Sequence, residues 1–434
     1  MQTSIETLSP LERRLNVDVP AEQIDREVEQ RLRKLSRTVR LAGFRPGKVP
    51  LKIVAQHYGP QVRSEVIGDA VQNAFAEAVR NQNLRVAGYP RIERKEGGDA
   101  SQVSFSAVFE VYPEVKLGDV AGVRIDRPAL AVGDAEVDKT IEILRKQRSS
   151  WTDADRAARG GDRVTVDFTG RIDGAEFAGG SAKDFGVVLG ERQMLPEFET
   201  ALSGVKTGET KTFPVTFPAD YAGREVAGKT AGFEVAVKRV EERQLPQVDA
   251  EFARLLGVAD GDTAKMRSEI RANVEREVRK RVENDVKQKA MQALLDTTRI
   301  DVPKSLVEME VQRLVQQTRA ELESRGLKSD RLPMGVDAIE QQARRRVTLG
   351  LILGELVKAH GLGAKPEQVR VLVEEHAQSY EQPGEVVKWL YSEPQRLAEF
   401  EGLAVESNVV AWVLEHAKVE DKAVSFDELM GGAV

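Results

Sequence analysis

A cluster of cations stands out early in the chain. Eight Lys or Arg side chains and no acid fall within residues 31–52, although the whole chain carries a formal net charge of −6. These cations are Arg31, Arg33, Lys34, Arg37, Arg40, Arg45, Lys48 and Lys52. Cations at this density suit phosphate groups, because each contact releases counterions and adds salt-sensitive affinity. The sequence therefore predicts a local anionic partner and excludes a surface that is basic overall.

The cations surround an unusual loop, GFRPGKVP, at residues 43–50. Its two glycines permit unusual backbone angles and its two prolines stiffen the chain, so we expect a rigid tip. The tip presents Phe44 beside Arg45, an apolar anchor next to a planar cation, and such pairs make good binding hot spots. The alternative is a solvated helix face followed by an ordinary turn. The exposed aromatic residue and the lack of acids favour a binding tip.

Side chains that could act as nucleophiles or metal ligands are sparse. The chain has no cysteine, which excludes disulfides and thiolate sites. Its four histidines, His57, His360, His376 and His416, are scattered and form neither an HxH nor an HExxH pattern. We therefore expect no metal, no cofactor and no catalysis through a nucleophile.

Aromatic and large apolar residues are concentrated between residues 151 and 243, although only 5% of the whole chain is aromatic. The set consists of Phe168, Phe177, Phe185, Met194, Leu195, Phe198, Tyr221 and Phe233. Some of these residues must form the core of a small domain. Their spacing alone leaves open whether the others line a pocket.

Residues 1–112 have the pattern of an α+β domain. LERRLNVDVP is typical of a strand, and SQVSFSAVFEVYP alternates apolar and polar residues as a half-buried strand does. Between them we expect a helix from Pro20 to about Arg40, a short helix ending near Gln56 and another helix over residues 62–80.

The composition changes twice further along the chain. Residues 113–150 are a turn-rich linker that ends in a helix near residues 134–148. Residues 151–243 are rich in glycine and contain short alternating segments, which indicates a compact antiparallel β domain. Its one short helix is LPEFETAL, where Pro196 suits a first-turn position.

Helical patterns dominate residues 244–434. We expect helices to start near Pro303, Ala338 and Pro366, and a last helix over residues 404–418. The most apolar helix, VTLGLILGELVKAHG, should be buried and should stop at Gly361. An earlier helix, with Thr263 as its expected N-cap, repeats an apolar residue every four positions. The repeat consists of Met266, Ile270, Val274, Val278, Val282, Val286, Ala290 and Leu294. Because each step of four drifts by about 40° around the helix, its two ends should contact different neighbours.

Composition also indicates where the protein acts. With 434 residues, 41% of them apolar and 31% charged, the chain suits a globular protein of several domains. Its start lacks the apolar region of a secretory signal, and its apolar runs are far shorter than the ~18 residues that span a bilayer. We expect a cytosolic protein with no membrane and no DNA partner.

The loop GFRPGKVP and the following KIVAQHYG resemble the ribosome-docking loop of the bacterial trigger factor family. The family pattern Gly-Phe-Arg-x-Gly-x-x-Pro is matched by Gly43, Phe44, Arg45, Gly47 and Pro50. Pro46 and Lys48 occupy the variable positions, and some members have lysine where this chain has Pro46. The resemblance implies that the loop contacts a ribosomal protein and rRNA beside the polypeptide exit tunnel.

Residues 151–243 resemble FKBP-type peptidyl-prolyl isomerases in VTVDFTGRIDGAEFAGG, VVLGERQMLPEFETAL and FPADYAG. The resemblance implies that the eight aromatic and apolar residues named above line the isomerase pocket. Ala178 occupies a position that is commonly acidic in that family, so we expect reduced or narrower activity, with the Tyr221 hydroxyl available to the substrate. Such chemistry needs no nucleophile, because an apolar pocket removes the water that stabilises the planar amide.

The trigger factor resemblance covers essentially the whole chain and implies a multidomain α+β fold. Its parts would be an α+β ribosome-binding domain (1–112), a linker (113–150), an FKBP-like antiparallel β domain with a short helix (151–243) and an all-helical chaperone domain with extended arms (244–434). The implied function is an ATP-independent chaperone that binds nascent or unfolded polypeptides at the ribosome and isomerises X–Pro bonds. A weak homodimer of the protein that is not bound to ribosomes is compatible with this function.

Two other functions remain open at this point. The first is a free-standing prolyl isomerase with a helical holding domain, which the basic loop and the lack of a signal sequence disfavour. The second is a non-enzymatic RNA-binding or scaffolding protein in which residues 151–243 are an inert β module. A prolyl-peptide assay separates the second function from both enzymes.

Overall fold

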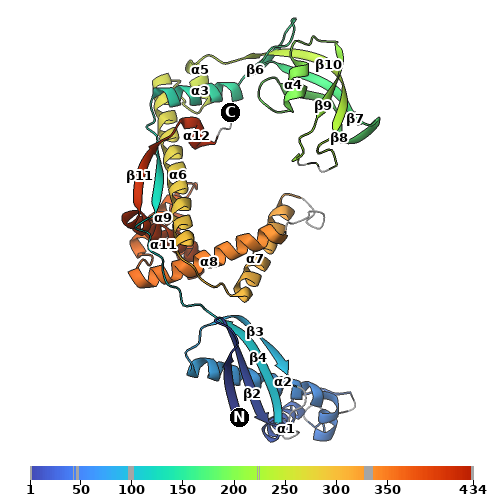
Figure 1. The fold of residues 1–434 in the computed structure, drawn as a ribbon, viewed down its shortest axis with the longest axis vertical. Coiled ribbons are helices and arrows are strands. Elements are labelled where there is room, and N and C mark those ends of the chain that lie inside the picture. Colours follow the sequence, from blue (N-terminus) through green and yellow to red (C-terminus); the bar gives the residue numbers. More distant parts are fainter. Residues whose placement is uncertain are drawn as a thin grey trace. The chain divides into compact units, whose positions relative to one another are not determined.

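The computed structural model describes the chain except for residues 1, 43, 45–47, 96–101, 222, 224, 327–335 and 432–434. The chain divides into two compact units. One comprises Met1–Ile125 and Lys287–Glu420, and the other comprises Asp126–Val286 and Asp421–Val434. Two parts of the chain form antiparallel sheets accompanied by helices, and a further part is mainly helical (Figure 1), so the fold is multidomain α+β as the sequence predicts.

The first part of the chain forms a four-stranded antiparallel sheet with two helices. The strands are β1 (Gln2–Thr7), β2 (Glu12–Pro20), β3 (Val86–Arg94) and β4 (Gln102–Val111), in the order β1-β2-β4-β3. The helices are α1 (Ala21–Ser36) and α2 (Leu51–Asn81). Every second residue of β4, from Val103 to Val111, is buried, which confirms the predicted half-buried strand. Phe75 of α2 packs edge-to-face on Phe109, with ring centroids 5.0 Å apart.

Helix α2 differs from the prediction of two helices. It is continuous, with Pro60 inside it. Proline removes one backbone hydrogen bond and crowds the preceding turn. The buried Val54, Val62 and Val66 still pack both halves of the helix into one core, so packing outweighs this local cost. Helix α1 is also shorter than predicted and ends at Ser36.

The β domain of the second unit has five antiparallel strands and one short helix. The strands are β6 (Ser150–Asp153), β7 (Arg163–Ile172), β8 (Ala175–Val188), β9 (Thr210–Thr216) and β10 (Thr230–Gln244). They follow the order β6-β10-β7-β8, and β9 pairs with β10. Helix α4 (Pro196–Leu202) has Pro196 in its first turn, as predicted.

The remaining elements of the second unit pack on the first half of helix α6 (Thr263–Thr297). They are α3 (Asp134–Gln147), α5 (Ala250–Leu255) and α12 (Phe426–Met430). The two-stranded sheet of β5 (Arg124–Ala129) and β11 (Lys418–Ala423) was not predicted. Both strands are rich in charge and lack an apolar alternation. Ion pairs join them, including Arg127 to Asp421 at 2.6 Å.

Helices dominate the second segment of the first unit. Besides the end of α6, they are α7 (Lys304–Ser324), α8 (Val336–His360), α9 (Pro366–Ala377), α10 (Pro383–Tyr391) and α11 (Pro394–His416). The apolar α8 is followed by Gly361 at φ +66°, the predicted stop. Ile352 and Leu356 of α8 are almost fully buried. The last long helix starts at Pro394, ten residues earlier than predicted.

The four-residue repeat of α6 behaves as predicted. Met266, Ile270, Val274 and Val278 pack with residues of α3 and α5. Ala290 and Leu294 pack instead with residues of α8 and α11. The N-cap prediction was wrong by one residue, because the Asp262 carboxylate accepts from the amides of Ala264 and Lys265. A carboxylate is a good acceptor for the free amides of a first turn.

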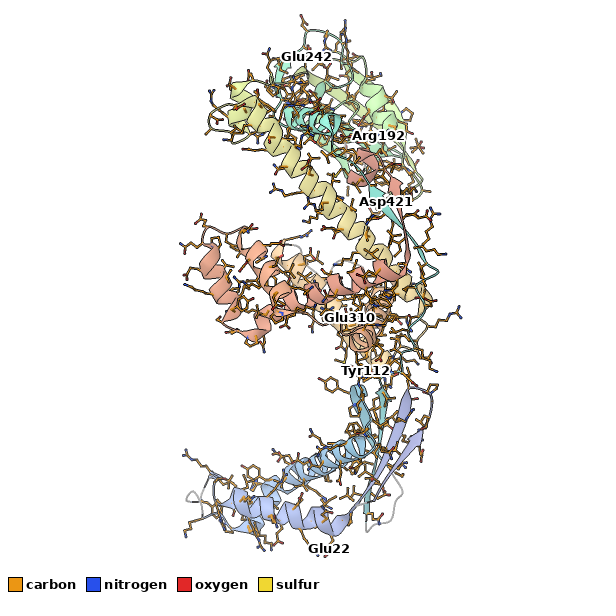
Figure 2. All side chains as sticks on the ribbon, turned by 90° about the vertical axis from the view of Figure 1, so that its left-hand side faces the viewer. Glu22, Tyr112, Arg192, Glu242, Glu310 and Asp421 are labelled. Atoms are coloured by element: carbon orange, nitrogen blue, oxygen red, sulfur yellow. The ribbon has the colours of Figure 1, made fainter. Side chains whose placement is uncertain are left out.

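Two carboxylates fix helix α7. Glu110 of β4 accepts from the amides of Lys304 (3.0 Å) and Ser305 (2.6 Å) at its N-terminus. Partial burial raises the pKa of Glu110, but these hydrogen bonds outweigh it and hold the pKa below its ordinary value. Within the helix, Glu310 (labelled in Figure 2) pairs with Arg313 and with Arg346 of α8.

Among the described residues, no helix combines the length and hydropathy that crossing a membrane requires.

Candidate functional site

The segment around Phe44 is anchored on both sides. Val39 and Val49 are only 9% and 5% exposed and belong to the core of the first domain. Between them the side chain of Phe44 is 39% exposed, and its amide donates to Leu41 O at 3.1 Å. The predicted contact residues Gly43, Arg45, Pro46 and Gly47 lie outside the described residues. Lys48 and Pro50 are exposed.

The cations near this segment divide into two groups. Arg31 and Arg33 pair with Asp69 and Glu29, and the hydrogen bond to Asp69 raises the pKa of Arg31. The second group is exposed and has no acid within salt-bridge distance in the described part of the chain. It consists of Lys34, Arg37, Arg40, Lys48 and Lys52. These five cations flank residues 43–47 in the sequence, and an anionic partner can reach them because they are exposed.

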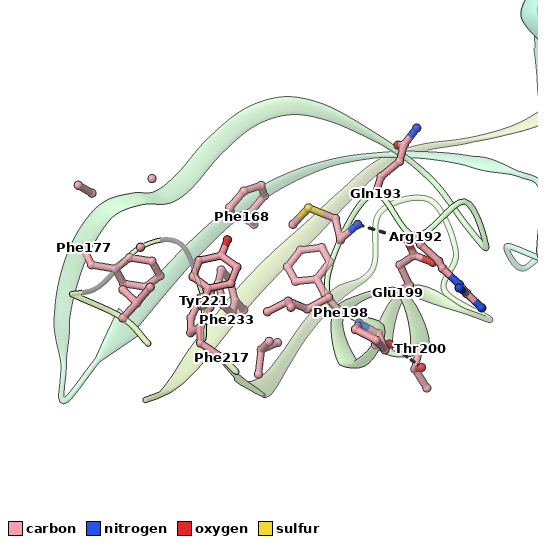
Figure 3. Close-up of a pocket in the computed structure, with 18 of the residues that line it drawn as sticks. Phe168, Phe177, Arg192, Gln193, Phe198, Glu199, Thr200, Phe217, Tyr221 and Phe233 are labelled. Atoms are coloured by element: carbon pink, nitrogen blue, oxygen red, sulfur yellow. Dashed lines mark hydrogen bonds between the residues drawn. The ribbon is translucent and has the colours of Figure 1, made fainter. Parts of the chain in front are cut away.

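A cavity of about 960 Å³ opens in the β domain. Its walls come from β7, β8, β10, helix α4 and the segments before α4 and after β9 (Figure 3). The lining includes Phe168, Phe177, Ala178, Gly179, Gly190, Arg192, Gln193, Met194, Leu195, Pro196, Phe198, Glu199, Thr200, Val215, Phe217, Tyr221, Gly223, Val226 and Phe233. Most of these side chains are apolar, as expected for a pocket that binds an apolar group.

The structure brings nearly all of the predicted pocket residues together. Phe168, Phe177, Met194, Leu195, Phe198, Tyr221 and Phe233 line the cavity. Phe185 does not line it. Its ring is 38% exposed and packs edge-to-face on Phe168, with centroids 5.7 Å apart. Phe185 therefore supports a wall residue from behind.

Phe198 forms the centre of the aromatic wall. It is 1% exposed, and its ring centroid lies 5.6 Å from Phe168, 5.3 Å from Phe213 and 5.4 Å from Phe233. All three are edge-to-face contacts, a favoured geometry for aromatic pairs. Phe198 is the third residue of α4, so the short helix positions it. The wall is rigid because each ring is held by others.

Phe217 is another wall residue, and it was not among the predicted pocket residues. Its ring centroid lies 4.9 Å from Tyr221 and 5.9 Å from Phe177. The residue lies just after the alternating strand β9, in FPADYAG. That position continues the buried alternation of Phe213 and Val215, which is the signal that could have identified it.

Few polar groups face the cavity. Tyr221 is 40% exposed, and within the described residues its hydroxyl has no hydrogen-bond partner. Ala178 lines the cavity and offers no polar group at the position where FKBP-type isomerases commonly have an acidic residue. The one acidic side chain in the described lining, Glu199, accepts hydrogen bonds from two backbone amides, Gly190 N and Met194 N. The cavity is therefore a mainly apolar site, and its polar side chains are Arg192, Gln193, Glu199, Thr200 and Tyr221.

The opposite face of β7 carries charge. Asp167 accepts from the amide of Asp184 at 2.7 Å and pairs with Lys238 at 3.0 Å. Both contacts hold the pKa of Asp167 below its ordinary value, and the hydrogen bond from the Asp184 amide has the larger effect. Glu176 lines a second cavity on this side. Within the described residues, no group of three or more Asp, Glu or His side chains is arranged to hold a metal ion.

Family models match most of the chain. The model described as bacterial trigger factor protein (TF) matches residues 1–144, and the model for its C-terminus matches residues 262–415. The model described as FKBP-type peptidyl-prolyl cis-trans isomerase matches residues 154–238, which contain the cavity.

Several relatives match over the full length. A trigger factor of Nitrosospira multiformis is 57% identical over 99% of this chain and 100% of its own. A trigger factor of Aromatoleum aromaticum is 55% identical over 100% of both chains. A solved structure of the trigger factor chaperone, from work on promiscuous substrate recognition, covers 96% of this chain and 100% of its own. Its sequence identity is 17% and its TM-score is 0.48.

Proposed function

The chain belongs to the trigger factor family of ribosome-associated chaperones, and we propose that it docks on the ribosome through the loop at residues 43–50. It contains an FKBP-type peptidyl-prolyl isomerase domain. A free-standing isomerase is not favoured, because relatives named trigger factor match the whole chain. The protein acts in the cytoplasm on nascent polypeptides. Its parts are the docking domain (1–112), linker (113–150), isomerase domain (151–243) and helical chaperone domain (244–434).

The observation that carries the docking proposal is the exposed Phe44, flanked in the sequence by exposed cations that have no acid within salt-bridge distance among the described residues. The flanking Val39 and Val49 are buried, whereas Phe44 between them is exposed. Phosphates of rRNA would attract the exposed cations, and a protein surface beside them would accept the ring. The contacts between cations and phosphates weaken with salt, and the contact between the Phe44 ring and a protein surface does not.

Co-sedimentation with purified ribosomes tests this proposal at two salt concentrations. We expect the wild-type protein to pellet with ribosomes, and to do so less at the higher salt. A Phe44→Ala, Arg45→Ala double variant should stay in the supernatant at both. A Lys116→Ala variant, which removes an exposed cation from the linker, is the matched control. Equal pelleting of the wild type and the double variant would refute the loop assignment.

We place the isomerase reaction in the cavity of the β domain. Rotation about a peptide bond has a barrier of about 18–20 kcal/mol, because resonance gives the C–N bond partial double-bond character. Water stabilises the polar planar amide. The aromatic wall would exclude that water and so favour the less polar twisted state, and each 1.36 kcal/mol removed from the barrier gives about tenfold in rate. The Tyr221 hydroxyl has no hydrogen-bond partner among the described residues and would donate to the substrate.

A prolyl-peptide assay of single variants tests this location. Phe198→Ala removes the centre of the wall, and Tyr221→Phe removes only the hydroxyl. We expect a loss of at least tenfold in kcat/KM for the first and a smaller loss for the second. Phe185→Ala is a useful comparison, because that ring lies outside the cavity lining. An unchanged rate for Phe198→Ala would exclude the cavity as the site.

Exposed apolar side chains of the helical domain are the proposed contacts for unfolded chains. Val371, Tyr380, Trp389 and Tyr391 are 52%, 50%, 57% and 44% exposed. They lie on α9, on α10 and in the turn between these two helices, which pack against each other. Large exposed apolar side chains on neighbouring elements indicate an interaction surface. Binding through such side chains needs no nucleotide.

A further inference from the structure

The segment between β8 and α4 forms one wall of the cavity. It contributes Gly190, Arg192, Gln193, Met194 and Leu195 to the lining. Its backbone is unusual, with φ +90° at Gly190 and +55° at Arg192. A left-handed conformation is unfavourable for a residue with a side chain, so the surroundings must hold the segment in place.

Glu199 supplies that support. Its carboxylate accepts from Gly190 N through Oε2 at 3.1 Å and from Met194 N through Oε1 at 3.3 Å. One side chain thus bonds both ends of the segment, and Figure 3 draws the bond to Met194. In the described part of the chain, neither amide has a backbone acceptor instead.

The position of Glu199 in α4 links two walls of the cavity. It follows Phe198, the centre of the aromatic wall, in the first turns of the helix. The carboxylate therefore ties Gly190 and Met194 to the same turn that presents Phe198. Hydrogen bonds from backbone amides to a carboxylate are stronger than neutral ones, so they suit this task.

We propose that Glu199 is a positioning residue of the isomerase site, which holds the 190–195 wall against the aromatic wall. This inference rests on the proposed location of the site in the cavity. The wall contacts the substrate in both its planar and its twisted state. Loss of its position should therefore raise KM more than it lowers kcat.

The test compares Glu199→Gln with Glu197→Gln in the full-length protein. Gln keeps the size of the side chain. Its carbonyl oxygen can accept from one of the two backbone N–H groups, but its NH2 group faces the other and cannot accept a hydrogen bond from it. Glu197 lies in the same first turn and is exposed, and it makes no hydrogen bond with the described residues, so its variant controls for the lost charge. Prolyl-peptide kinetics give kcat and KM for each. Amide exchange of Gly190 and Met194, measured by NMR, reports the two hydrogen bonds directly.

We expect Glu199→Gln to raise KM by about tenfold, with faster exchange of one or both amides, and Glu197→Gln to match the wild type. Equal kinetics for the two variants would overturn the inference. So would a lower kcat with unchanged KM and a lower melting temperature, which indicates a merely structural role. Phe198→Ala keeps the two proposals apart. If it leaves the rate unchanged, the site location fails; if it lowers the rate while Glu199→Gln has no effect, only the positioning role fails.

Discussion

Gly170 offers a sensitive test of the aromatic wall. It lies opposite Phe233 in the β7–β10 ladder. A Cβ added there would lie 2.6 Å from Phe233 Cε1 and 2.9 Å from its Cζ. Ordinary contacts between carbon atoms are about 3.5–4.0 Å, so in the Gly170→Ala variant the ring of Phe233 must move by about 1 Å. Phe233 is packed against Phe198 and Phe213, and cannot move alone.

The expected magnitude follows from that crowding. Overpacking of a core costs about 1–3 kcal/mol, and the misplacement of a site by about 1 Å costs up to about a hundredfold in rate. We expect Gly170→Ala to lower kcat/KM by about 10- to 100-fold in a protease-coupled prolyl-peptide assay. The melting temperature of the domain should fall by several degrees.

Gly232 provides the matched control. It precedes Phe233 on β10, and a Cβ there would have no atom within 4 Å. Gly232→Ala should therefore keep wild-type kcat/KM. If Gly170→Ala is as active as the wild type, or if both variants lose equal activity, the rings do not form the site as described.

Three further predictions concern stability and client binding. Glu241 is buried, and the hydrogen bond from Arg163 lowers its pKa. Glu241→Gln should cost on the order of 2 kcal/mol in chemical denaturation, less than for a fully buried pair because Arg163 is one-third exposed. The pKa of Glu110 is also depressed, so its contribution to stability is present above the ordinary Glu pKa and is lost as pH falls through the folded value. Glu110→Gln should therefore flatten that part of the acid unfolding curve. A Trp389→Ala, Tyr391→Ala variant should suppress aggregation of an unfolded client several-fold less well, with wild-type isomerase activity; equal suppression would exclude this surface.

Patterns with a strong period gave the fold most readily. The alternation of β4 predicted its half-buried face, and the four-residue repeat of α6 predicted that its two ends contact different neighbours, because apolar side chains set both patterns. The strands β5 and β11 were missed because ion pairs such as Arg127–Asp421, between residues almost 300 positions apart, join them. No local pattern can show such a pairing.

The candidate site followed the same division. Family motifs predicted Phe168, Phe198 and Tyr221, which the structure brings into one cavity. The family resemblance also implied Phe185, but its ring lies outside the lining of the cavity and packs on Phe168. The support that Glu199 gives could not be predicted, because it consists of hydrogen bonds to backbone amides, which leave no signal in side-chain types.

Hydrogen–deuterium exchange of the full chain, free and bound to purified ribosomes, is the most direct test of docking through the loop. We expect new protection over residues 37–54, around Phe44 and the unpaired cations, and little change in the β domain that holds the cavity. Protection elsewhere, with residues 37–54 unchanged, would contradict the assignment of this loop as the ribosome contact.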